Sequence, residues 1–379
     1  MATIALLCSD ELLITEIRNI VKPFDGFNLH VLKNHAAALQ FLNYELPEIN
    51  IINYSDPLLK GEETLKVLSA DPWLHYGASI VLHSRANEAE LRAKAGGINL
   101  VSVLEIDRLK YYLPRVLSIL HSNRSLLNQW NFHALVRSGL TGEFIIEQDA
   151  FDLITHINIL VNFLYNGNLI GHLERESLYV ELVEKIMKAL QKGFKGKLTI
   201  DFSVQSQESI FTVTTGDPDF LWSEVLPTTS APGSTNLMGY SFQEGAAKLK
   251  IRIEHRKLGT GLVPQFFQEQ KVQEFKDQQI VFSQGEDSTF LYFIIAGKFE
   301  VLANGRQVSV LTPVDVFLGE MSFLVKNKRT ATVRSIGAGK LIKISKEEYI
   351  QSLKEKPHYA FFLARMLAER LVRLHEGLI

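Results

Sequence analysis

Short β-type runs, separated by turn residues, fill the last third of the chain and constrain its fold more than any other pattern. They follow one another at intervals of about eight to twelve residues. The runs are residues 279–282, 290–295, 298–303, 307–311, 331–335 and 340–344, with turn signals at 284–285, 296–297 and 304–305 and at Gly337 and Gly339. This spacing predicts a β jelly-roll barrel. The stretches 346–353 and 357–376 then predict C-terminal helices, the second long and amphipathic.

A compact motif lies within this barrel. It reads Gly319-Glu320-Met321-Ser322, and then, after a short stretch, Arg329-Thr330-Ala331-Thr332, so that Glu320 and Arg329 are nine positions apart. An arginine can offer two parallel N–H donors to the oxygens of a phosphate. A short helix over 321–324 would present free backbone N–H groups to the same anion. The motif therefore predicts an anion site with a carboxylate beside it.

The segment resembles the cyclic-nucleotide-binding domain of the catabolite activator protein, the regulatory subunit of protein kinase A and cyclic-nucleotide-gated channels. The resemblance implies that Glu320 accepts a hydrogen bond from the ribose 2′-OH and that Arg329 binds the cyclic phosphate. The full set of ligand-binding residues that it implies is Gly319, Glu320, Met321, Ser322, Arg329 and Thr330. A hydroxyl at Thr330 leaves cyclic AMP and cyclic GMP both open, and we favour cyclic AMP because it is the more prevalent ligand.

Two further features follow from this resemblance. The family's Gly-Asp before the motif is replaced by Val314-Asp315-Val316, a departure that concerns the loop more than the ligand contacts. The last helix would supply the lid over the base, and the candidates are Arg373, Leu374 and His375. The stripe Phe361, Leu363, Leu367, Leu371 and Leu374 is expected to pack against the barrel or against a second copy in a homodimer.

The first 122 residues show a different pattern, in which short apolar runs alternate with helical stretches. Apolar runs at 4–7, 27–32, 49–52, 78–82 and 98–104 are each followed by a helical pattern, at 12–21, 36–46, 62–68, 88–95 and 110–120. Five strand–helix repeats predict an α/β doubly wound domain with a parallel sheet. Their order resembles a response-regulator receiver domain.

The receiver chemistry, however, is missing from this segment. The resemblance places Ser9 and Asp10 at the acidic pair, Asn53 at the phosphoryl acceptor, and His83 and Ser84 near the Ser/Thr position. No lysine occurs between Lys94 and Lys110, where the catalytic lysine would stand. An amide cannot form an acyl phosphate, so we expect a pseudo-receiver that serves as a docking module. Phosphorylation at a shifted residue such as Asp56 is the alternative.

The middle segment, residues 123–265, predicts an α+β domain. Helical patterns at 123–138, 149–165 and 178–190 precede strand-like runs at 197–204, 209–215 and 250–255. This order resembles a GHKL ATPase of the anti-sigma-factor type. Lys188 stands where that family has its Mg²⁺-binding asparagine, and Asp217 and Asp219 replace the glycines that approach the phosphates. These changes predict a degenerate, inactive domain, and an unassigned interaction domain is the alternative.

Composition narrows the setting. The 379 residues carry a formal net charge of −2, which argues against a general nucleic-acid or membrane-surface binder. Cys8 is the single cysteine, so no intrachain disulfide can form and a reducing, cytoplasmic location is expected. The histidines show no metal-ligand spacing, and no apolar run approaches the length that spans a bilayer.

These features together predict a multidomain protein with domains at 1–122, 123–265 and 266–379. The sequence ends at Ile379 without a helix-turn-helix after the lid helix, and a transcription factor of the catabolite-activator type is therefore not expected. We expect a non-enzymatic bacterial signalling protein that binds a cyclic nucleotide and passes the change to an unidentified protein partner. The alternatives are a cyclic-nucleotide-regulated ATPase or protein kinase and a ligand-free scaffold.

Overall fold

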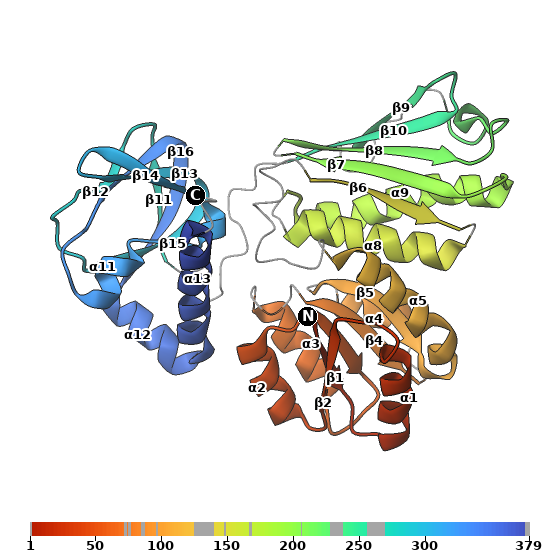
Figure 1. Ribbon diagram of the computed structural model, residues 1–379, viewed down its shortest axis with the longest axis horizontal. Coiled ribbons are helices and arrows are strands. Elements are labelled where there is room, and N and C mark those ends of the chain that lie inside the picture. Colours follow the sequence, from red (N-terminus) through yellow and green to blue (C-terminus); the bar gives the residue numbers. More distant parts are fainter. Residues whose placement is uncertain are drawn as a thin grey trace. The chain divides into compact units, whose positions relative to one another are not determined.

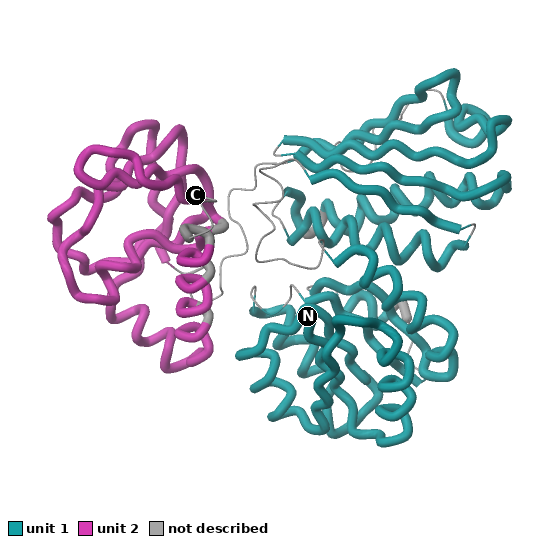
Figure 2. Tube along the Cα trace, viewed as in Figure 1, with its two compact units in different colours: residues 1–258 teal, residues 259–379 magenta. Residues whose placement is uncertain are grey.

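The computed structural model divides the chain into two compact units, residues 1–258 and 259–379, and each is described by itself (Figure 2). The residues that it describes are 2–71, 74, 77–84, 88–95, 98–124, 140–147, 149–166, 169–205, 207–227, 238–255 and 270–375. The helix expected over 123–138 lies almost wholly outside these residues.

The first part of unit 1 is a parallel sheet with helices on both faces (Figure 1). Its five strands lie in the order β2-β1-β3-β4-β5, as in the doubly wound folds. The elements are β1 (Ala2–Leu7), α1 (Glu11–Val21), β2 (Phe27–Leu32), α2 (His35–Glu45), β3 (Ile49–Asn53), α3 (Gly61–Ala70), β4 (Ala78–His83), α4 (Glu88–Lys94), β5 (Leu100–Glu105) and α5 (Leu109–Ser122). The alternation of strands and helices expected from the sequence is therefore present.

The burial pattern explains why this part forms two layers of helices. Every residue of β3 and β4 is buried, as expected for central strands of a parallel sheet. One face of the sheet packs with α2, α3 and α4 in a separate core. The other face packs with α1 and α5, and this second core continues into the next part of the chain.

The second part of unit 1 is an antiparallel sheet with two long helices on one face (Figure 1). Its strands lie in the order β6-β7-β8-β10-β9. They are β6 (Leu140–Ile146), β7 (Leu198–Val204), β8 (Glu208–Thr215), β9 (Met238–Gln243) and β10 (Lys248–Glu254), with helices α8 (Ala150–Asn166) and α9 (His172–Lys192). Strand β6 was not expected from the sequence. Thr141, Gly142 and Glu143 follow one another near its start, so the alternation of apolar and polar residues is weak.

Side chains of the second part complete the edge of the first sheet. Strand β5 lies at that edge, and a register shift between Ser79 and Ile80 of its partner β4 marks a bulge in the pairing. The amides of Asn158 and Asn162 on α8 donate to the carbonyls of Val101 and Leu100, over 3.1 Å and 2.8 Å. These bonds replace a neighbouring strand, since a buried carbonyl needs a donor.

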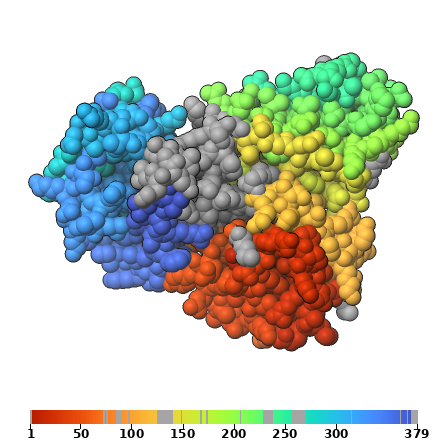
Figure 3. Space-filling model, in the orientation of Figure 1, coloured from red at the N-terminus to blue at the C-terminus, as the bar shows by residue number. Residues whose placement is uncertain are grey.

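Two arginines reinforce this junction. Arg175 on α9 is buried, lies 4.6 Å from the ring centre of Tyr165 and donates to the carbonyl of Ile98. Arg115 on α5 forms ion pairs with Asp149 and Asp152, at 2.7 Å and 2.8 Å. The two sheets of unit 1 thus share one core and several buried polar contacts, and the division expected at residue 122 falls inside this unit. In Figure 3 the orange and yellow surfaces of the two parts adjoin.

Unit 2 is an antiparallel β structure followed by helices. Its strands are β11 (Val272–Phe275), β12 (Ile280–Phe282), β13 (Phe290–Ala303), β14 (Arg306–Leu311), β15 (Phe317–Leu318) and β16 (Thr332–Ser345). Strands β13 and β16 pair along most of their length and form the centre of the sheet. The helices are α11 (Glu320–Val325), α12 (Lys346–Glu355) and α13 (His358–His375).

The turns expected at 296–297 and at Gly337 with Gly339 are not turns. The chain continues through both places, so that two expected hairpins are single strands with irregular pairing. A Cβ atom on Gly297, whose φ is +98°, would lie 2.7 Å from the Cα of Gly339. The glycines are required because the two long strands approach closely there, which a local pattern cannot distinguish from a turn.

We predict that unit 1 loses stability below pH 6.5 because of His156, a buried residue of helix α8. Burial lowers the pKa of His156 from its usual value of 6.5, because the charged ring is poorly solvated. The unfolded chain then binds a proton that the folded one excludes, so stability is full above pH 6.5 and falls as the pH decreases. The loss by pH 5.5 is at most about 1.4 kcal/mol.

Denaturant titrations at pH 7.5 and 5.5 measure this loss. Tryptophan fluorescence reports on unit 1 alone, because all three tryptophans lie within residues 1–258. The control is His156→Gln, whose amide can still donate to the Asp152 carbonyl that His156 Nδ1 contacts at 2.8 Å. The prediction is wrong if the variant and the parent lose the same stability between the two pH values.

Candidate ligand-binding site

The site is built around the start of α11, between β15 and β16. Gly319 precedes the helix in the left-handed conformation, with φ +78°, and so turns the chain from β15 directly into the helix. The helix begins at Glu320, and its first N–H groups have no partner within the helix. The structure therefore places the carboxylate of Glu320 and a set of backbone donors at the same turn.

Arg329 lies beneath this turn and is 3% exposed. One terminal nitrogen, Nη1, donates to the carbonyl of Gly319 over 2.7 Å and to the hydroxyl of Ser322 over 3.1 Å. The other, Nη2, donates to the carbonyl of Phe290. The guanidinium also lies 4.2 Å from the ring centre of Phe282. Main-chain atoms from two segments thus hold the positive charge in position.

The electrostatics of this arginine suit an anion. Burial lowers the pKa of Arg329 from its usual value, and the nearby carboxylates of Glu286 and Glu320 oppose that shift. An arginine nonetheless stays protonated near neutral pH, because its reference pKa is so high. Its Nε is buried and has no hydrogen-bond partner among the described residues. A buried donor of this kind is costly unless an acceptor reaches it, and a phosphate oxygen is such an acceptor.

The space around Gly319 is too small for a side chain. A Cβ atom at this position would lie 2.5 Å from Nη1 of Arg329 and 3.2 Å from the ring of Phe282. A side chain on Gly319 would therefore displace the arginine. The glycine, the orphaned Nε and the adjacent carboxylate together fit a ligand that carries an anionic group next to hydroxyl groups.

Glu320 is tied to the last helix of the chain. Its Oε1 accepts a hydrogen bond from Nη1 of Arg370 on α13, at 2.5 Å. The second terminal nitrogen of Arg370 donates to the carbonyls of Asp315 and Phe317, the latter over 2.6 Å. One side chain therefore connects α13 with the carboxylate and with the loop before it.

Arg370 was not among the residues expected from the sequence. The expected lid residues were Arg373, Leu374 and His375, whose side chains lie outside what the structure describes. In the apolar stripe expected on this helix, Leu363 is buried, whereas Phe361 and Leu371 are 48% and 56% exposed in the single chain. Packing of the two exposed residues against a second copy stays a prediction. Tyr359 and Met366, which were not part of that stripe, are also buried. Arg370 lies seven residues after Leu363, on the same face of the helix, and that spacing would have indicated it.

The remaining expected ligand residues are placed as follows. Gly319, Glu320, Ser322 and Arg329 lie together. The side chain of Met321 is 64% exposed, so a role in binding would fall to its backbone N–H. Thr330 is exposed next to the arginine. Helix α12 supports the group from behind, because Tyr349 packs edge-on against Phe323 of α11, and burial raises the pKa of Tyr349 to about 12.

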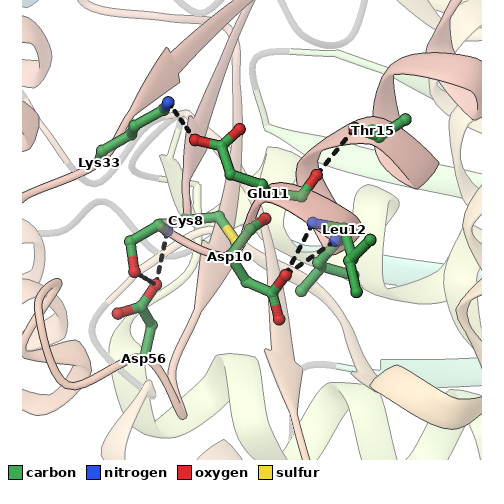
Figure 4. Close-up of polar contacts among 9 residues, drawn as sticks. Cys8, Asp10, Glu11, Leu12, Thr15, Lys33 and Asp56 are labelled. Carbon is green, nitrogen blue, oxygen red and sulfur yellow. Dashed lines mark hydrogen bonds and ion pairs between the residues drawn. The ribbon is translucent and has the colours of Figure 1, made fainter.

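The carboxyl edge of the first sheet of unit 1 shows how the receiver-like positions are used (Figure 4). Asp10 caps α1, accepting from the backbone N–H groups of Leu12 and Leu13. The Nδ2 of Asn53 lies 3.7 Å from the sulfur of Cys8. Both side chains thus contact neighbouring parts of the same sheet edge, and the carboxylate of Asp10 points to the start of α1.

Asp56, the alternative phosphorylation site, is also engaged. Its Oδ2 accepts from the backbone N–H and the hydroxyl of Ser9, at 2.6 Å and 2.7 Å. Its Oδ1 accepts from the N–H of Leu58 at 3.0 Å. Asp56 is 6% exposed, so a phosphoryl donor would have to displace these bonds.

The divergent positions of the antiparallel part of unit 1 likewise have structural partners. Lys188 pairs with Glu184 one turn earlier on α9, at 3.2 Å, on the wall of an open pocket. Asp217 accepts from the backbone N–H groups of Lys195 and Asp219, which closes the turn after β8. These backbone bonds lower the pKa of Asp217.

Within the described ranges of the chain, no group of three or more histidine, cysteine, aspartate or glutamate side chains is arranged to hold a metal ion. Among the helices that the structure describes, none is both long and apolar enough to cross a membrane.

Comparison with known proteins assigns the unit that contains Arg329. Residues 272–356 match the model of the cyclic nucleotide-binding domain family. A Pycsar effector protein of Xanthomonas perforans, XpPycTIR, is 38% identical over 93 residues, which are 23% of this chain and 30% of that protein. The cyclic AMP receptor protein of Thermus thermophilus is 30% identical over 96 residues, 24% of this chain and 44% of that protein.

A cGMP-dependent protein kinase of Plasmodium berghei is 31% identical over 81 residues, 21% of this chain and 9% of that protein. The chain thus spans less than half of the length of each of these relatives. Residues 272–356 are a cyclic nucleotide-binding domain. The receiver-like and ATPase-like assignments within residues 1–258 stay predictions.

We predict that Gly319→Ala destabilises unit 2 more than Gly305→Ala does. Both glycines have φ +78°, so both substitutions carry the same backbone strain. Only at Gly319 does the new Cβ meet Arg329, whereas at Gly305 no atom lies within 4 Å among the described residues. The extra loss is about 1–3 kcal/mol, the usual cost of overpacking. Hydrogen exchange of the β13 amides measures it, and equal losses would contradict the described position of Arg329.

Proposed function

Starting from a cyclic nucleotide-binding domain at residues 272–356, we propose that this protein is a sensor of a 3′,5′-cyclic nucleotide. The observation that carries the proposal is the placement of Arg329, 3% exposed with an unpartnered Nε, and Glu320, 4% exposed, at one glycine turn. A buried donor is costly unless an acceptor reaches it, and the anionic group of a ligand would supply that acceptor. Glu320 pairs with Arg370 through Oε1, and Oε2 can accept from a hydroxyl of the same ligand.

The phosphate end of the ligand is assigned to Arg329 and the start of α11. A cyclic phosphate carries one negative charge, which the guanidinium and the free N–H groups of Glu320, Met321 and Ser322 can share. Nε of Arg329 is the donor that no described residue uses. The hydroxyl of Ser322 already touches Nη1 and can turn to donate to a phosphate oxygen.

The ribose end is assigned to Glu320. Arg370 holds its Oε1, which fixes the orientation of the carboxylate, and Oε2 makes no hydrogen bond to a described residue. An ionised carboxylate only accepts hydrogen bonds, so a ribose 2′-OH is a suitable donor for that oxygen. A ligand without this hydroxyl would leave Oε2 of the carboxylate without that donor.

The base is the least constrained part of the ligand. The contacts that support the proposal concern phosphate and ribose, which all cyclic nucleotides share. We favour cyclic AMP because of its prevalence, and Thr330 keeps cyclic GMP as the second candidate. The similar proteins include one named for each of these two nucleotides. A binding panel should therefore also include the pyrimidine cyclic nucleotides.

We further propose that the protein is not an enzyme and signals through a protein partner. The occupied positions of Asp10, Asn53 and Asp56 support a receiver-like module without phosphoryl transfer. The ion pair between Lys188 and Glu184 supports the proposal that the antiparallel part is likewise not an active ATPase. A ligand that favours one position of α13 would change the affinity of the chain for its partner, or for a second copy in a homodimer.

We predict micromolar or tighter binding of cyclic AMP to the full chain by isothermal titration, with cyclic GMP, cyclic CMP and cyclic UMP titrated in parallel. Arg329→Ala removes the partner of the cyclic phosphate and should weaken binding at least 100-fold, because hydrogen bonds to charged groups contribute about 1.5–3 kcal/mol each. The matched control is Arg306→Ala, an exposed arginine on β14. Absence of binding by all four nucleotides would overturn the sensor proposal.

A second prediction concerns the ribose. The 2′-deoxy form of the ligand that binds best should bind about 10- to 100-fold more weakly, since it leaves Glu320 without its donor. Glu320→Gln should bind the normal ligand less well and lose most of this discrimination. Glu300→Gln is the control, because Glu300 is a buried glutamate that pairs with Arg334 across the sheet. Equal affinity for both forms in the parent protein would rule out the role of Glu320.

A further inference from the structure

The loop before the candidate site contains a strained residue. Val316 has φ +61° and ψ −55°, a conformation close to that of the strained γ-turn. Positive φ is uncommon outside glycine, and for a β-branched side chain it is a genuine outlier. Residues held in this way cluster at ligand clamps and switches, where the surrounding structure enforces the conformation.

Bonds on both sides of Val316 enforce it here. On one side, Thr312 and Asp315 bond each other reciprocally around the single turn Pro313–Asp315, with the N–H of Thr312 donating to the carboxylate of Asp315 over 2.8 Å. In the middle, the carbonyl of Val316 accepts from the N–H of Ile294 on β13, over 2.8 Å. The barrel therefore fixes the position of the turn.

The remaining bonds come from the last helix. Nη2 of Arg370 donates to the carbonyls of Asp315 and Phe317, which are the residues immediately before and after Val316. Nη1 of the same guanidinium binds Glu320. Arg370 is only 11% exposed, so these bonds are made inside the protein. The strained residue is thus bracketed by two bonds that exist only while α13 is docked.

We propose that the turn at Val316 is a strained latch that Arg370 holds closed, and that its strain sets how often α13 undocks from unit 2. When α13 leaves, the carbonyls of Asp315 and Phe317 lose their shared donor and the turn can relax. The strain released then favours the undocked state. A loop without this strain would keep α13 docked for a larger fraction of the time.

The choice of residue supports this role. Glycine populates positive φ without strain and would suit the turn better than valine does. Valine at this position raises the energy of the docked state relative to the undocked one. The latch rests on the proposed function in one respect, namely that a docked Arg370 holds Glu320 in the orientation that receives the ribose.

The test is hydrogen–deuterium exchange of the α13 amides, residues 363–370, in the nucleotide-free full chain. Val316→Gly should slow this exchange about fivefold or more, because it lowers the energy of the docked state. Val316→Ala keeps a Cβ atom and most of the strain, and it should slow exchange by less than twofold. In the Arg370→Leu background, Val316→Gly should no longer slow the exchange of α13.

The control for general strain relief is Gln278→Gly. Gln278 is exposed, has φ +60° and lies in the turn between β11 and β12. This substitution should leave the exchange of α13 unchanged within twofold. The latch is overturned if Val316→Gly fails to slow the exchange of α13, or if Gln278→Gly slows it equally.

Titration of the same variants with the cyclic nucleotide separates the latch from the proposed function. Slower exchange in Val316→Gly, in a protein that binds no cyclic nucleotide, would support the latch and overturn the sensor. Tight binding by the parent chain, with the same α13 exchange in the parent and in Val316→Gly, would support the sensor and overturn the latch.

Discussion

The burial of the Arg329 guanidinium against main-chain carbonyls is the interaction on which unit 2 depends at its site. Two of its nitrogens bind the carbonyls of Gly319 and Phe290, so the position of the charge is set by the backbone rather than by flexible side chains. The turn at Gly319 can exist only without a side chain, because the guanidinium occupies that space. The buried donor that remains, Nε, has no hydrogen-bond partner among the described residues.

A second arginine extends this arrangement to the end of the chain. Arg370 reaches from α13 to Glu320 and to the carbonyls on either side of Val316. The carboxylate of Glu320, the loop conformation and the position of the last helix therefore share one side chain. A change in the orientation of Glu320 would alter a bond that keeps α13 in place.

Unit 1 is organised by a different constraint, the need to satisfy the edge of a sheet. The carbonyls of Val101 and Leu100 in β5 accept from Asn158 and Asn162 on α8. The carbonyl of Ile98, just before β5, accepts from Arg175 on α9. The core on that face continues across the junction. The parallel sheet and the antiparallel sheet are consequently one compact unit, although their sequence patterns differ.

Local patterns were sufficient wherever one segment dictates its own structure. Buried apolar runs such as those of β3 and β4 predicted the parallel sheet, because a strand covered on both faces must be apolar throughout. The pattern failed for β6, where polar residues interrupt it, and for Gly297 and Gly339, where glycines serve a close approach of strands instead of turns. These cases depend on what lies opposite the segment.

The sequence by itself determined the chemistry available at the site, since the order Gly319-Glu320 and Arg329 within a barrel pattern indicated the candidate residues and their spacing. Only the tertiary structure decided how those residues are held. Arg370 contacts Glu320 from fifty residues away, and Val316 adopts a positive φ because distant bonds enforce it. The physical reason is that such contacts join segments remote in the chain, and their energies depend on a geometry that no local pattern contains.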